Sequence, residues 1–128
     1  MSAAQKARLA GEVLVAYVRV RLLLARHDDA REILRILRDV KPLEGSRRSI
    51  APDRLARAVT RTLAHLPSDT RCLAQSLTLT ALLARRGHSG RVVIATRPSP
   101  FAAHAWVELD GRPLLAPHDF AGWRLAEL

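Results

Sequence analysis

The chain has 128 residues, which is enough for one domain with its own hydrophobic core but too few for two. Its 21 basic and 12 acidic residues give a formal net charge of +9, which suits nucleic acid, an anionic membrane or an acidic protein or peptide. The basic residues are scattered and no aromatic-rich basic stripe accompanies them, so nucleic-acid binding is not expected. The apolar run at residues 13–25 contains Arg19 and Arg21 and is too short to span a bilayer, and no export signal is visible. These features predict a cytoplasmic protein without stable membrane insertion.

The first half of the chain has the periodicity of helices. Apolar residues recur at helical spacing from residue 3 to residue 26, and a second helix is expected to begin after Asp28 or Asp29. The segment 41–53 is rich in proline, glycine and serine and predicts a loop. Pro52 suits the first turn of a third helix that runs to about His65.

The segment 66–87 carries the most informative helix pattern. Ser68 or Asp69 can cap its start, leucines supply a buried side, and Gly87 is a natural C-terminal stop. This places Cys72 within the first turn of a largely buried helix. Unpaired backbone N–H groups and the positive end of the helix dipole are then expected near its sulfur.

The pattern changes to that of strands after residue 90. Residues 91–96 are rich in β-branched side chains and predict a short buried strand, followed by a turn at residues 97–100. Residues 103–109 alternate, so that His104 and Trp106 point to one face and the residues between them to the other.

The C-terminal part predicts a hairpin. Asp110 is followed by glycine, a pair typical of a two-residue turn, and residues 112–117 would form the returning strand. The tail is expected to pack Phe120 and Trp123 against the sheet. Helices first and an antiparallel sheet last predict an α+β domain.

Cys72 is the only cysteine, which excludes a disulfide within the chain and a zinc site built from several thiolates. No metal and no cofactor are expected. A lone cysteine is either an inert buried thiol or a reactive one. A peptidase thiol must react as the thiolate, whereas free cysteine has a pKa of about 8.5. A helix start and a neighbouring imidazolium both favour the thiolate, and the same imidazole can protonate the leaving amine.

Five histidines could supply that imidazole. Three of them, His27, His65 and His88, lie beside predicted helix ends or turns, and His118 lies in the tail. His104 lies in a strand between two alanines, which leave room for another element to approach its ring. Periodicity alone does not choose between a structural and a catalytic role for it.

Two motifs, RCLAQSLTLTALLARRG and FAAHAWVELDGRPL, occur in this order between Arg71 and about Leu115. Together they resemble the transglutaminase-like leader peptidases of lasso-peptide biosynthesis, which have a Cys-Leu-x-x-Ser-Leu helix followed by an Ala-His-Ala-Trp-Val-Glu strand. The resemblance implies a transglutaminase-like, papain-like cysteine peptidase fold. It also implies that Cys72 is the nucleophile and His104 its base.

The resemblance further implies a carboxylate that orients the histidine, on or just after the returning strand. Around the expected place the chain has Leu-Ala-Pro at residues 115–117, with no acid. Asp119 is the nearest acidic residue downstream and is the preferred candidate, with Asp110 in the turn as the alternative. Glu108 shares the face of His104 but reads as a strand-surface charge, and a backbone carbonyl or an amide is another way to orient the ring.

Two further residues are candidates for the site. Gln75 follows Cys72 by one helical turn, and its amide could donate to the oxyanion of the tetrahedral intermediate beside the backbone N–H of Cys72. Trp106 could line the substrate cleft, although an aromatic residue on that face also suits the core.

The resemblance also implies partners: a precursor peptide with its leader, a leader-binding recognition-element protein and a lasso cyclase. Within a single domain of residues 1–128, the helical residues 1–65 are the expected docking surface, and residues 66–128 are the expected catalytic core. Two alternatives stay open. One is a scaffold of the same fold that has lost the chemistry, which the missing acid motivates, and the other is an enzyme that transfers the acyl group to an amine.

Overall fold

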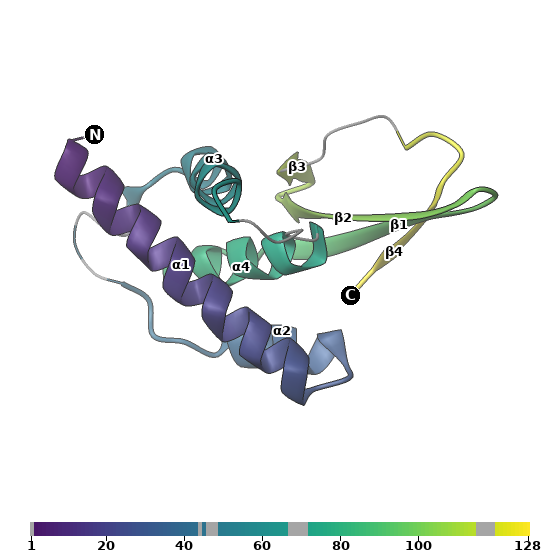
Figure 1. Ribbon diagram of the computed structural model, residues 1–128, viewed down its shortest axis with the longest axis horizontal. Helices are drawn as coiled ribbons and strands as arrows, with labels where there is room; N and C mark the ends of the chain where they lie inside the picture. Colours follow the sequence, from purple (N-terminus) through teal and green to yellow (C-terminus); the bar gives the residue numbers. More distant parts are fainter. Residues whose placement is uncertain (1, 44, 46–48, 67–71, 115–119) are drawn as a thin grey trace.

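The computed structural model describes residues 2–43, 45, 49–66, 72–114 and 120–128. These residues form an α+β arrangement in which helices precede a small antiparallel sheet (Figure 1). The elements in chain order are α1 (Ala3–Arg26), α2 (Ala30–Arg38), α3 (Pro52–Leu63), α4 (Cys72–Arg85), β1 (Arg91–Pro98), β2 (Phe101–Leu109), β3 (Arg112–Leu114) and β4 (Arg124–Glu127). The predicted fold class is therefore confirmed.

The helix ends follow from the capping residues. The hydroxyl of Ser2 accepts from the N–H of Gln5, whose side chain accepts from the N–H of Ser2, so α1 begins with a capping box. Of the two aspartates expected to cap α2, Asp29 does so, because its carboxylate accepts from the N–H of Arg31. Pro52 occupies the first turn of α3 as predicted, and the helix ends at Leu63.

Helix α4 is the centre of the fold, and Figure 1 shows it between the other helices and the sheet. Most of its residues from Ala74 to Leu83 are buried, as expected for a helix with neighbours on all sides. The buried hydroxyls of Thr78 and Thr80 donate to the carbonyls of Ala74 and Ser76, so they need no partner outside the helix. Gly87, at φ 80°, follows the end of the helix as predicted.

One hydrophobic cluster joins the helices to the sheet. It includes residues of α1, α2, α3 and α4 together with Val92, Val107, Leu109 and Leu114 from the strands. The helical first half and the Cys72-bearing second half therefore share one core.

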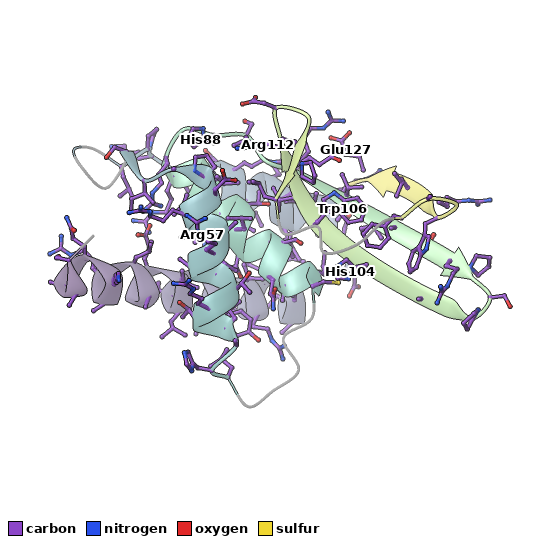
Figure 2. The ribbon with its side chains drawn as sticks, turned by 90° about the horizontal axis from the view of Figure 1, so that it is seen from above. Arg57, His88, His104, Trp106, Arg112 and Glu127 are labelled. Carbon is purple, nitrogen blue, oxygen red and sulfur yellow. The ribbon has the colours of Figure 1, made fainter. Side chains whose placement is uncertain are left out.

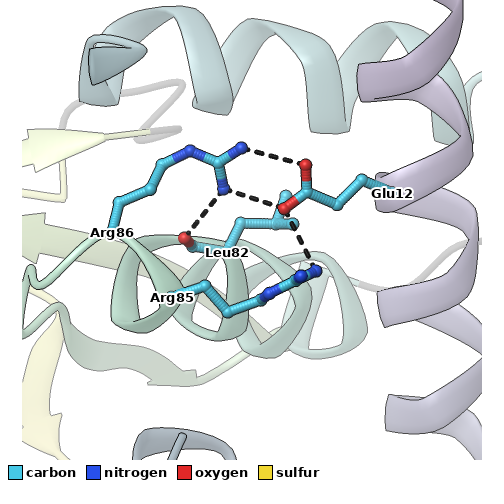
Figure 3. A network of polar contacts seen from close by, with 4 residues as sticks. All are labelled: Glu12, Leu82, Arg85 and Arg86. Atoms are coloured by element: carbon cyan, nitrogen blue, oxygen red, sulfur yellow. Dashed lines mark hydrogen bonds and ion pairs between the residues drawn. The ribbon is translucent and has the colours of Figure 1, made fainter. Parts of the chain in front are cut away.

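An ion pair also lies inside this core. The guanidinium of Arg86, just after α4, donates to both carboxylate oxygens of Glu12 on α1, at 3.0 and 2.9 Å, and to the carbonyl of Leu82 (Figure 3). Arg85 lies 3.2 Å from the same carboxylate. Because Glu12 is 8 % exposed and Arg86 2 % exposed, this pairing offsets much of the cost of burying the two charges.

The sheet has the strand order β3-β2-β1-β4, and every pairing is antiparallel. Strands β1 and β2 pair along their whole length, and their hairpin extends away from the helices (Figure 1). Asp110 and Gly111 form the turn between β2 and β3 with φ values of 54° and 77°, as the predicted two-residue hairpin requires.

The two faces of the sheet have different neighbours. Val107 pairs with Val92, and both belong to the core shared with the helices. Trp106 pairs with Val93 on the other face, where Phe120 and Trp123 pack against them as the sequence predicted. His104 shares this second face, because it is two residues from Trp106 along the strand.

The strand predictions need two corrections, and a third prediction extends beyond the described residues. The first two strands are longer than expected: β1 continues to Pro98 and β2 already begins at Phe101, so only Ser99 and Pro100 lie between them. The returning strand was expected over residues 112–117; β3 is described over Arg112–Leu114, and residues 115–117 lie outside the described residues. Strand β4 was missed, because its four residues are all exposed and lack the alternation of a half-buried strand.

Candidate active site

Cys72 lies at the start of the central helix. Within the described residues α4 begins with Cys72, and its thiol is half-buried. The first N–H groups of a helix have no acceptor within the helix and carry partial positive charge. The expected capping residues, Ser68 and Asp69, lie outside the described residues.

The sulfur of Cys72 lies against strand β2. The backbone N–H of Ala105 donates to Cys72 Sγ at 3.2 Å. Among the described strands, β3 pairs with this side of β2 only from Val107 to Leu109, so the strand edge at Ala105 is open to another acceptor. The start of α4 supplies that acceptor. Sequence reasoning missed Ala105, because the contact uses its backbone rather than its side chain.

The hydrogen bond places the sulfur beside the backbone of His104. Ala105 N is the amide nitrogen of the peptide bond that joins these two residues, so the bond brings the helix start and the histidine-bearing strand together. His104 itself lies opposite Ala95 in the β1–β2 pairing, and its side chain is half-buried (Figure 2).

The imidazole of His104 is held by an aromatic neighbour. Its ring stacks on Phe120, with the ring centroids 5.5 Å apart and the planes at 21°. Phe120 also stacks on Trp106 at 4.7 Å and meets the edge of Trp123 at 5.0 Å. The sequence predicted that Phe120 packs on the sheet, but it did not predict that Phe120 contacts His104.

Trp106 belongs mainly to this aromatic cluster. It is 4 % exposed, and its indole Nε1 has no hydrogen-bond partner in the part of the chain that the structure describes. Arg97 covers the other side of the cluster, with its guanidinium carbon 4.8 Å from the ring centroid of Trp123. The role of Trp106 in lining a substrate cleft stays a prediction.

The remaining candidates differ in what can be said of their positions. Gln75 is half-buried and lies one turn after Cys72 on α4. Asp119, the preferred third residue, lies outside the described residues. Asp110 is exposed in the β2–β3 turn, six residues along an extended strand from His104, which corresponds to about 20 Å. Of the two acids, only Asp119 is therefore left as a candidate to orient the ring.

Metal ligands and membrane-spanning helices were also looked for among the described residues. In the described ranges, no three histidine, cysteine or acidic side chains lie in a group that could hold a metal ion. No helix among the described residues is both long enough and apolar enough to cross a bilayer.

The fold and the site thus combine an α+β domain, a thiol at the start of its central helix and a histidine-bearing strand against that thiol. The sequence matches the model of the transglutaminase-like superfamily over residues 14–122. The chain therefore belongs to the transglutaminase-like superfamily, which includes cysteine peptidases and transglutaminases. No curated protein and no solved structure matches the chain.

Proposed function

We propose that this protein is a cysteine peptidase that removes the leader from a ribosomally made lasso-peptide precursor. The observation that carries the proposal is the 3.2 Å hydrogen bond from Ala105 N–H to Cys72 Sγ, which joins the helix start to the strand of His104. Membership of the transglutaminase-like superfamily supports a thiol-based reaction at an acyl group. The resemblance of the segment between Arg71 and Leu115 to lasso leader peptidases supports this choice of substrate.

In the proposed first step, the thiolate of Cys72 attacks the carbonyl carbon of the scissile peptide bond. The C–N bond of the tetrahedral intermediate then breaks, and the imidazolium of His104 gives its proton to the leaving amine. The backbone N–H of Cys72 is the proposed donor to the oxyanion, with the Gln75 amide as a second donor. The products of this step are the released amine and an acyl-thioester on Cys72.

In the second step, water attacks the thioester carbonyl while the imidazole of His104 takes a proton from it. The C–S bond breaks, and the carboxylic acid leaves the site. If an amine took the place of water, the product would be an amide, and its mass would differ accordingly. The mass of the product therefore separates hydrolysis from amide transfer.

We propose Asp119 as the carboxylate that orients the ring of His104. An oriented imidazole keeps one nitrogen toward the thiol and donates from the other. The stacking of Phe120 on His104 limits the ring's freedom from another side. Asp119→Asn should therefore lower the cleavage rate less than His104→Ala does.

The proposed partners are a leader-binding recognition-element protein and a macrolactam-forming lasso cyclase. The helical residues 1–65 are the proposed docking surface for the leader-binding protein, because many of their arginines are exposed. Substituting exposed arginines there should weaken that association without changing the reactivity of the thiol. Unchanged affinity would rule out this docking surface.

The first test is whether the genes beside this one encode a short precursor peptide and a leader-binding protein, and these two are then combined with the purified protein. The wild-type protein should release the leader as a hydrolysis product identified by mass spectrometry. Cys72→Ala and His104→Ala should each abolish cleavage while the circular dichroism spectrum is unchanged. Normal cleavage by either variant, or no cleavage by the folded wild-type protein with its partner present, would contradict the proposal, and the latter would favour a scaffold.

A further inference from the structure

A basic cleft lies between the N-terminal part of α1 and the outer side of α3. Its volume is about 610 Å³, within the range of sites that bind small ligands or peptide segments. Its apolar floor is formed by Leu9 and Ala58, among others. Its rim carries four cationic side chains, Lys6, Arg54, Arg57 and Arg61.

The positive charge of this basic cleft is not compensated within it. The residues that line it include no acid, and none of the four cations forms an ion pair with any residue that the structure describes. All four are exposed, and Arg57 is seen on α3 in Figure 2. Arg54, Arg57 and Arg61 are three and four residues apart, so they follow one side of the helix over about 10 Å.

The basic cleft continues toward the candidate active site. Arg57 and Arg61 also line a second hollow of about 360 Å³, whose other wall is formed by Pro113 and Leu114 of β3. Among the described residues that line this second hollow, Asp53 is the only acid, and its carboxylate is paired with Arg112 at 3.3 Å.

Strand β3 connects the second hollow to the thiol. Leu114 pairs with Val107 on β2, and the thiol contacts the same strand at Ala105, two residues further along. Two residues of extended strand span about 7 Å. The basic cleft therefore shares Arg57 and Arg61 with the second hollow, and the β3 wall of that hollow and Cys72 both lie against strand β2.

We infer that the basic cleft binds an acidic, partly aliphatic segment of the peptide substrate and directs the chain past β3 toward Cys72. The inference rests on the proposed function, because the occupant is the peptide that the thiol cleaves. Carboxylates of the segment pair with Arg54, Arg57, Arg61 and Lys6, and its aliphatic side chains cover Leu9 and Ala58.

The lining favours a peptide over other anions. Cations that extend over about 10 Å on α3 are too far apart for one phosphate group to contact all of them, whereas an extended peptide places acidic side chains at several points along that length. The described residues that line the basic cleft include no aromatic side chain on which bases could stack.

Binding can be measured without catalysis, using the full-length Cys72→Ala protein. The probe is a rhodamine-labelled peptide of three Leu-Glu-Glu-Gly repeats. Its binding to the protein is measured by fluorescence anisotropy at low salt. We expect saturable binding that weakens at least tenfold when Arg57→Glu and Arg61→Glu are combined. The matched control combines Arg19→Glu and Arg31→Glu, which are exposed arginines outside the basic cleft and change the net charge equally. This control should stay within about twofold of the parent protein.

The two arms of the experiment separate the possible occupants. The same peptide with glutamine for glutamate should bind at least tenfold more weakly, and oligothymidylate should bind more weakly than the acidic peptide. Equal loss in both double variants, equal binding of the glutamine peptide, tighter binding of oligothymidylate or no binding of the acidic peptide would each overturn the inference. If the glutamate variant does not fold, the Arg57→Gln and Arg61→Gln pair gives the same comparison.

The inference and the proposed function can fail separately. If the peptide binds in the basic cleft but the wild-type protein cleaves nothing, the proposed peptidase activity is wrong and the proposed binding site stands. If cleavage is unaffected by Arg57→Glu and Arg61→Glu, the proposed peptidase activity stands and the proposed binding site is wrong.

Discussion

Glu12 on α1 and Arg86 beyond the end of α4 form a two-pronged ion pair that is buried between the helices. This pair ties the longest helix to the helix that carries Cys72, and Arg85 adds a third charge at its more exposed side. A buried charge that loses its partner is costly, because the interior cannot solvate it as water does. The pair therefore makes a strong prediction for stability.

Replacing Glu12 with glutamine keeps the size of the side chain but removes the carboxylate charge that both nitrogens of the Arg86 guanidinium contact. We expect Glu12→Gln to lower the free energy of unfolding by about 3–5 kcal/mol. The control is Glu32→Gln on α2, where the carboxylate faces His27 and Arg35 at 3.8 and 4.0 Å and is partly exposed. That loss should stay below about 1 kcal/mol. Urea unfolding measures the stability of both variants. Equal losses of stability in Glu12→Gln and Glu32→Gln would show that the buried ion pair contributes no more than the exposed one.

Replacing Gly90 or Gly11 with alanine is predicted to change the stability of the fold in opposite directions. A Cβ at Gly90 would lie 2.9 Å from Val107 Cγ1 and 3.1 Å from Leu83 Cδ1, and both side chains are fully buried. We expect Gly90→Ala to destabilise the fold by about 1–3 kcal/mol through overpacking.

Gly11 is the matched control, because it lies inside α1 and a Cβ added there would meet no described atom within 4 Å beyond its chain neighbours and the nearby helix backbone. Gly11→Ala should stabilise the fold by about 0.5–1 kcal/mol, since alanine loses less backbone entropy in a helix. Thermal unfolding of both variants tests the pair of predictions. If Gly90→Ala stabilises the protein, the packing of Gly90 against Val107 and Leu83 is looser than the distances indicate.

The ion pair between Glu127 on β4 and Arg91 on β1 predicts how the stability of the fold depends on pH. The hydrogen bond from Arg91, with Nε 2.8 Å from Oε1, lowers the pKa of the Glu127 carboxyl. Because the folded pKa is lowered, the pair stabilises the fold above the ordinary glutamate pKa of about 4.3, and this contribution is lost as the pH falls through the folded value. Both side chains are solvent-exposed, so salt should reduce the effect.

An NMR titration of the Glu127 carboxyl carbon tests this directly. The midpoint should lie below the ordinary value in the wild-type protein and rise toward it in Arg91→Gln. Arg19→Gln, on α1, should leave the midpoint unchanged. A midpoint that does not respond to Arg91→Gln would mean that the pair does not persist in solution.

The features that sequence analysis predicted well depend on local patterns. Helix α1 was predicted with its observed bounds because its apolar spacing and its ends are both visible in the sequence. The Asp110-Gly111 turn was predicted because few residue pairs adopt positive φ at both positions. The buried leucines of α4 and its end before Gly87 were predicted from the same kind of local pattern.

The features that were missed depend on contacts between distant segments. Strand β4 forms because β1 has a free edge from Val93 to Thr96, and nothing in the exposed sequence of β4 reports that edge. The pairing of Glu12 with Arg86 likewise connects two helices that are far apart in the chain. The contact of Cys72 with Ala105 uses a backbone N–H, which every residue but proline has, so its position depends on the fold alone.

The central claim is that Cys72 is a nucleophile activated by its surroundings. The most direct measurement is the rate of Cys72 alkylation by iodoacetamide at pH 6, divided by the rate at pH 9 to correct for access to the thiol. We predict that this ratio in the native protein exceeds that of the urea-unfolded protein by about tenfold or more, because iodoacetamide reacts with the thiolate. His104→Ala should reduce the ratio toward the unfolded value. A native ratio equal to the unfolded one and unchanged by His104→Ala would contradict the claim.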